Sequence, residues 1–63
     1  MTPTQYRAVL KALGLSINGA GRFLGIAPRS SHGYARGEYP VPEVVAKLLR
    51  LMVKLDIRPE DVP

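Results

Sequence analysis

Residues 16–36, SINGAGRFLGIAPRSSHGYAR, predict two short helices joined by a tight turn. Gly25 follows the apolar pair Phe23-Leu24, and a glycine after a helix can take the left-handed conformation because it has no Cβ to clash. Pro28 suits the first turn of a new helix, where its missing N–H has no partner to lose. The chain is therefore expected to turn sharply after Gly25 and to start a helix at Pro28.

Three neighbouring residues support this interpretation. Ser16 is a favourable N-cap, so the first helix of the pair should run from Ser16 to about Leu24. Gly21, four residues before the turn glycine, leaves room for two helix backbones to approach closely, and Ile26 can place its side chain in the core. A helix, a glycine turn and a second helix with basic and polar side chains form the sequence pattern of a helix-turn-helix.

The flanking segments predict helices that support this pair. Thr2-Pro3-Thr4-Gln5 has the pattern of a capping box and opens a first helix that ends at Gly14. After the third helix, predicted over Pro28–Arg36, the prolines of Gly37–Pro42 favour an extended connector, because each pushes the residue before it out of helical geometry. A last helix is predicted over Glu43–Leu55, followed by at most one further turn. The inward residues expected of the first three helices are Tyr6, Val9, Leu10, Leu13, Ala20, Phe23, Leu24, Ser31, Tyr34 and Ala35.

The last predicted helix has more apolar surface than one core can use. At about 100° per residue its apolar side chains span an arc of roughly 200°, whereas a helix resting on one core needs little more than about 100°. Part of the excess is expected to cover Ile57 and Val62 of the tail. The rest is predicted to pair two copies of the chain, a common support for so small a core. The residues expected in this dimer interface are Val44, Leu48, Leu51 and Leu55.

The charge of the chain is distributed unevenly. A single domain of 63 residues has a net charge of +4. Met1–Gly37 contains five cations and no acid, whereas Glu38–Pro63 contains five acids and four cations. The first part is therefore expected to bind an anion. The alternative is that these cations are ordinary solvated side chains.

Composition also excludes several classes of function. With one histidine, no cysteine and no carboxylate before Glu38, the chain has no acid–base pair, catalytic triad or metal-ligand cluster. We therefore expect no enzyme, metal, cofactor or small-molecule substrate. RNA binding is a lesser option, because Tyr6 and Tyr34 are expected in the core and leave no aromatic platform. No run approaches about 18 apolar residues, and no secretion signal is recognisable, so no membrane association is expected.

Several motifs, taken together, resemble the phage repressor/Cro-type (XRE-like) helix-turn-helix proteins of bacteria and their viruses. They cover nearly the whole chain: the TPTQ start at Thr2–Gln5, LGLS at Leu13–Ser16, RFLGI at Arg22–Ile26, the PR start of the third helix, G-x-x-P-V-P at Gly37–Pro42 and VAKLLRLM at Val45–Met52. The resemblance implies an all-α fold, a compact bundle of four or five helices containing a lambda repressor-like helix-turn-helix. It also implies a cytoplasmic, nucleoid-associated homodimer that binds a palindromic operator in double-stranded DNA, usually to repress transcription.

On this interpretation the third helix reads DNA. Arginine near the start of such a helix can grip guanine with two hydrogen bonds, which makes Arg29 the leading candidate. The other predicted base contacts are His32, Ser30 and Gly33, and the predicted phosphate contacts are Arg22, Arg36, Arg7 and Ser16. Tyr39 in the connector is a further residue that could be exposed and touch a partner or a phosphate.

An alternative function belongs to a different class. Similar proteins usually have Gln or Glu where this chain has Ile17 and Gly19, Val or Ile where Ser31 stands, and often a long side chain in place of Gly33. These differences allow a protein-interaction or dimerisation module that keeps the helix-turn-helix scaffold without its DNA-reading surface.

Overall fold

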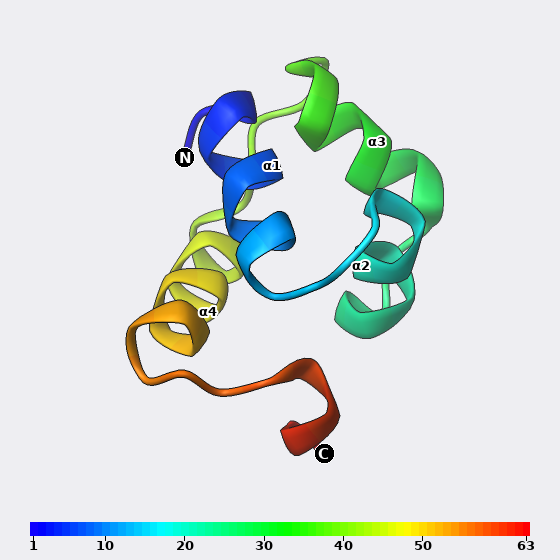
Figure 1. Cartoon of the computed structure of the whole chain (residues 1–63). Helices are drawn as coiled ribbons and strands as arrows, with labels where there is room; N and C mark the ends of the chain where they lie inside the picture. The colour runs from blue at the N-terminus through cyan, green and yellow to red at the C-terminus, as the bar shows by residue number, and fades with distance from the viewer.

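The computed structural model describes all residues from Met1 to Pro63 and contains four α-helices, one 3-10 turn and no strand. The elements are α1 (Pro3–Ala12), α2 (Ile17–Leu24), α3 (Pro28–Arg36), α4 (Glu43–Lys54) and η1 (Pro59–Asp61). In Figure 1, α1 lies between α4 on one side and the α2–α3 pair on the other. The prediction of an all-α bundle of four or five helices is confirmed.

The helix ends follow from residues at fixed local spacing. The Gln5 backbone N–H donates to Thr2 Oγ1 over 3.1 Å, and the Thr2 N–H donates back to Gln5 Oε1 over 2.9 Å, which completes the expected capping box of α1. Ser16 accepts the Gly19 N–H at its Oγ over 2.8 Å and so caps α2. Gly14, the residue expected to end the first helix, has a positive φ of 72°, and α1 runs to Ala12 with Leu13 as its C-cap.

The turn between α2 and α3 is built on two glycines. Gly25 has φ 72° and ψ 27°, the left-handed conformation expected of it. The next residue, Ile26, donates its backbone N–H to Gly21 O over 2.9 Å. A Cβ added to Gly21 would lie 3.2 Å from Pro28 Cα, a tight contact, so glycine favours this close approach of the end of α2 to the start of α3. The crossing of the two helices is thus set by backbone contact.

The core centres on Tyr6 of α1. Its ring is completely buried and meets Tyr34 of α3 edge to face, with ring centroids 5.6 Å apart and planes at 85°. Its hydroxyl shares a hydrogen bond of 2.6 Å with the buried hydroxyl of Ser31. Leu10, Ala20, Ala35 and Leu49 complete the cluster. The inward position predicted for Ser31 is confirmed, and one hydrogen bond satisfies both buried hydroxyls.

Burial raises the pKa of the Tyr6 phenol above its ordinary value, although the hydrogen bond from Ser31 opposes this effect. The unfolded chain therefore loses this proton at lower pH than the folded chain does. Stability contributed by the neutral phenol is complete below a pH of about 10 and is lost as pH rises through the folded-state pKa.

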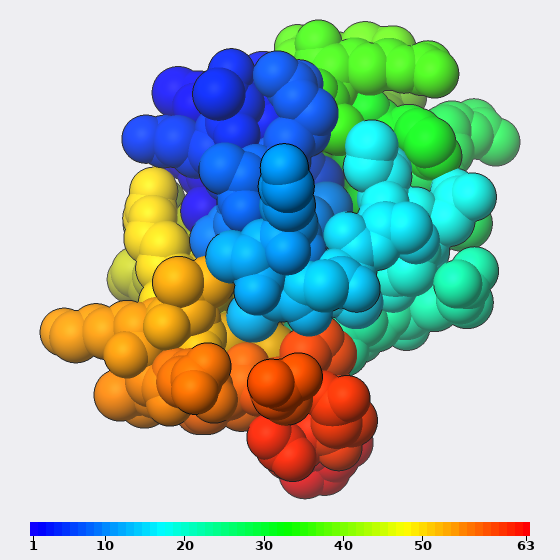
Figure 2. All heavy atoms as spheres, in the orientation of Figure 1, coloured from blue at the N-terminus to red at the C-terminus, as the bar shows by residue number.

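Helix α4 packs on the core through one edge only. Ala46, Leu49 and Met52 are buried, whereas Val44 is 78% exposed, Leu55 56% and Leu51 50%. After the helix, the Ile57 N–H donates to Met52 O over 2.8 Å and turns the chain back toward the end of α1. Ile57 and Val62 are half-buried there, and the tail forms the red lobe at the lower edge of Figure 2. Both tail residues are thus partly shielded from solvent, while Leu51 and Leu55 of α4 remain exposed.

The Tyr6–Ser31 hydrogen bond predicts a coupled effect on stability. Tyr6→Phe and Ser31→Ala should each lower the free energy of unfolding by about 1–2 kcal/mol, because each leaves one buried hydroxyl without a partner. The double variant should lose less than the sum, since it leaves no unpaired hydroxyl. Urea unfolding followed by circular dichroism measures all three. Strictly additive losses would show that the two hydroxyls do not interact.

Candidate nucleic-acid interface

Helix α3 has one buried and one outer face. Ser31, Tyr34 and Ala35 point into the core. We define the outer face of α3 as Arg29, His32 and Arg36, whose spacing of three and four residues places them on one side of the helix. Both arginines are exposed and the histidine is half-buried. Ser30, predicted to touch bases, is half-buried at the flank of this face, about 100° from Arg29.

Two of the predicted cations are free of internal partners. Arg29 and Arg22 are exposed, and neither forms a hydrogen bond or an ion pair within the chain. Arg22 extends back toward the start of α2, since one of its terminal nitrogens lies 3.8 Å from the point where a Gly19 Cβ would stand. There the first N–H groups of the helix have no carbonyl partner. The guanidinium and the positive end of α2 are thus combined in one place.

Asn18 of α2 lies beside the outer face of α3, although no sequence pattern had singled it out. His32 Nε2 and Asn18 Oδ1 are 2.8 Å apart, and since the amide oxygen can only accept, the imidazole donates. The bond joins the exposed sides of α2 and α3 across 14 residues of sequence. No local spacing could have indicated it, because it depends on the crossing angle of the two helices.

The structure contradicts the role predicted for Gly33. We expected an open position that could approach a base, but Gly33 is buried. The ring of Tyr39 lies over it, and a Cβ added to Gly33 would overlap ring carbons Cδ2 and Cε2. Gly33 therefore offers no surface to DNA, because the connector after α3 folds back onto it.

Two other predicted phosphate contacts are already engaged within the chain. Arg7 donates from Nη1 to the carbonyl of Ala35 and from Nη2 to Thr4 Oγ1 over 3.3 Å. Its guanidinium caps the last turn of α3, where a positive charge is favourable, so Arg7 has a structural contact instead of a free charge. Arg36 forms an exposed ion pair of 3.6 Å with Glu38. Ser16 remains exposed at the start of α2, with its hydroxyl oxygen accepting the Gly19 N–H.

A second surface is formed by the outward side of α4. We call Val44, Leu48, Leu51 and Leu55 the apolar strip. Three of the four are at least half exposed, and Leu48 is half-buried. Their spacing of four, three and four residues keeps them on one edge of the helix. Val44, Leu51 and Leu55 are therefore left open to solvent.

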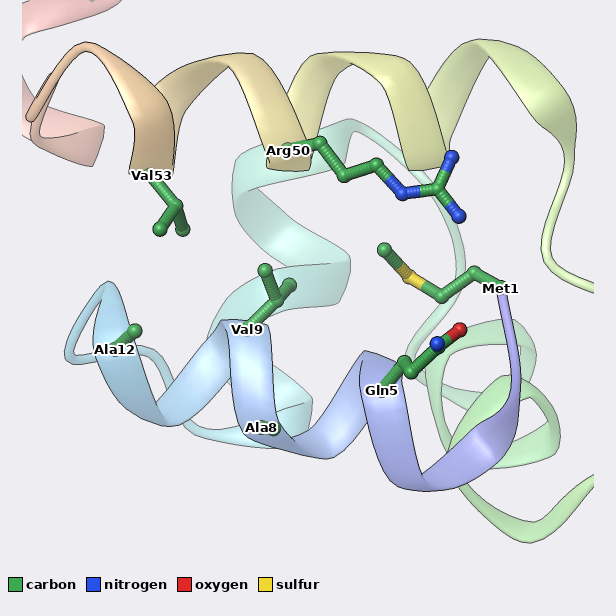
Figure 3. A pocket seen from close by; sticks show the side chains of 7 residues that line it. All are labelled: Met1, Gln5, Ala8, Val9, Ala12, Arg50 and Val53. Carbon is green, nitrogen blue, oxygen red and sulfur yellow. The ribbon is translucent and has the colours of Figure 1, made fainter.

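An open groove of about 360 Å³ lies between α1 and α4. Figure 3 shows Val9 and Val53 pointing toward one another from the two helices, with Met1 reaching in beside Arg50. The polar groups of its lining are the Gln5 amide and the Arg50 guanidinium, which form no acid–base pair. No cluster of three or more potential metal ligands occurs in the chain, and none of its helices has the length and apolar character that crossing a membrane requires.

Comparison with known proteins gave no matching family model, no similar curated protein and no similar solved structure. The resemblance to XRE-like proteins therefore rests on the motifs of the chain itself.

Proposed function

We propose that the chain is a sequence-specific double-stranded DNA-binding protein of the helix-turn-helix type, acting as a transcriptional regulator and most simply as a repressor. The observation that carries the proposal is the orientation of α3. Ser31, Tyr34 and Ala35 fix its inner side, so the outer face projects from the bundle with two exposed arginines and a histidine. Together with an acid-free segment from Met1 to Gly37, this positively charged surface complements the negative charge of a DNA backbone.

The dimensions of α3 suit a major groove, which is about 12 Å wide and admits one helix. Arg29 is the second residue of α3, the region from which reading helices contact base edges. Its unpaired guanidinium can donate two hydrogen bonds to guanine O6 and N7. His32 lies one turn after Arg29, and its imidazole is hydrogen-bonded to Asn18. The hydrogen-bonded side chains of His32 and Asn18 would therefore contact the DNA together.

Backbone phosphates would be bound beside the groove by α2. Arg22 supplies a free positive charge close to the N–H groups at the start of that helix. Such contacts carry no sequence information but position the protein on the duplex. They also make affinity depend steeply on salt, because each neutralised phosphate releases counterions.

Arg29→Ala tests the assignment of the reading residue. On a duplex selected from a random-sequence pool, the variant should bind about 1–3 kcal/mol more weakly, with little loss on unselected DNA. Gel shifts at two salt concentrations give both affinities and the salt dependence. Arg50→Ala is the matched control, since Arg50 is also exposed and free of ion pairs but lies on α4; it should bind as the wild type does. Equal losses in both variants, or binding that ignores salt, would contradict the proposal.

A second candidate function is a dimerisation or protein-interaction module, and the exposure of the apolar strip favours it. Exposing these apolar side chains to water is unfavourable. Burying them against a second copy of the chain would stabilise the dimer through the hydrophobic effect. Homodimerisation is also compatible with the first proposal, because two reading helices on a two-fold axis would match a palindromic operator. We propose that the strip joins two copies in either case.

Leu51→Glu should abolish this pairing, because it places a charge in the middle of the strip. Sedimentation equilibrium over a range of protein concentrations is expected to show a dimer for the wild type and a monomer for the variant. Val53→Glu is the control, since Val53 is 42% exposed on the groove side of the same helix; that variant should remain dimeric. A wild type that stays monomeric at every concentration would refute the role of the strip. Dimers without any DNA binding would favour the interaction module.

A further inference from the structure

The side chain of Tyr39 packs against the surface of α3 at Gly33. Gly33 is buried under the tyrosine ring, and no other residue type would leave room for the ring there. The ring nevertheless remains 45% exposed. It therefore occupies the space into which a side chain at position 33 would otherwise project, and it adds aromatic surface to a helix that has none on its outer side.

The backbone holds Tyr39 in this position. Gly37 ends α3 with a φ of 81°, which turns the chain back over the last turn of the helix. The carbonyl of Gly33 then accepts the backbone N–H of Glu38 over 2.9 Å and that of Tyr39 over 3.3 Å. Pro40 follows, which restricts Tyr39 to extended geometry. The ring is thus placed by hydrogen bonds and by a fixed backbone and does not hang from a free loop.

We propose that Tyr39 is a DNA contact of this protein, with its hydroxyl donating a hydrogen bond to a backbone phosphate at the edge of the groove. This rests on the proposed function. Gly33 is four residues after Arg29, so the ring that covers it lies only about 40° around the helix from that residue, one turn further along. The tyrosine hydroxyl forms no hydrogen bond within the chain, and phosphate oxygens are common partners of tyrosine at DNA interfaces.

The two cations at this end of α3 already have partners within the chain. Arg36 is the cation nearest in sequence, and its guanidinium is paired with Glu38 at 3.6 Å. Arg7 is bound to the last turn of the helix. Both of these guanidinium groups have partners within the chain, whereas the hydroxyl of Tyr39 has none and is free to donate to a phosphate.

Tyr39→Phe removes the hydroxyl and keeps the ring on Gly33. Fluorescence anisotropy with labelled duplexes should show about tenfold weaker binding to the selected and to the unselected duplex alike, because a phosphate contact carries no sequence information. Arg29→Ala should instead weaken mainly the selected duplex. Thermal unfolding of Tyr39→Phe should match that of the wild type, since the hydroxyl has no partner within the protein, and this separates a DNA contact from a structural role.

Gly33→Ala provides an independent variant that leaves the hydroxyl in place. The added methyl group must displace the ring, so the same loss of affinity is expected, and combining it with Tyr39→Phe should weaken binding no further. Tyr39→Phe with wild-type affinity for both duplexes, in a protein that Arg29→Ala does weaken, would overturn the role of Tyr39 alone. A wild type that binds neither duplex would overturn this contact together with the proposed function.

Discussion

The hydrogen bond between the Tyr6 and Ser31 hydroxyls sets the rotation of α3 about its own axis. Both groups are fully buried, and a buried hydroxyl without a partner is costly, so α3 cannot rotate without breaking the bond. Tyr34 reinforces the same orientation by meeting the Tyr6 ring edge to face. Because that side of α3 is fixed against α1, the side chains of Arg29 and His32 lie on the side of the helix that faces solvent. A polar contact inside the core thus determines which residues this protein presents outside it.

The position of α3 depends on α2, and α2 is a weak helix. Gly19 and Gly21 each cost about 1 kcal/mol relative to alanine in a helix interior, so packing must hold the segment in place. Gly21 offsets part of this cost, because it allows the backbone of α2 to pack in contact with Pro28 of α3. The same approach brings Asn18 into hydrogen-bonding reach of His32. Gly21, one of the two glycines that weaken α2 as an isolated helix, therefore also allows its close packing against the start of α3.

The features that could be predicted from the sequence are local. Thr2, Ser16 and Gly25 act on backbone groups within a few residues, and for that reason the helix starts and the turn were predicted correctly. The burial of Gly33 and the internal contacts of Arg7 were not foreseen, and both depend on residues distant in sequence. Gly33 is covered by a connector that folds back, and Arg7 binds a carbonyl 28 residues away. Periodicity likewise gave the total apolar arc of α4 but not the side that faces the core, which packing against α1 decides.

The proposed contact between the outer face of α3 and DNA can be tested by a nuclear magnetic resonance titration. Adding a short unselected duplex at low salt to the 15N-labelled protein should shift the amide signals of Asn18, Arg29, His32 and Tyr39, because the proposed phosphate contacts do not require a particular sequence. Signals from the apolar strip should stay unchanged at constant protein concentration. Shifts confined to α4, or no shifts at any DNA concentration, would contradict the account.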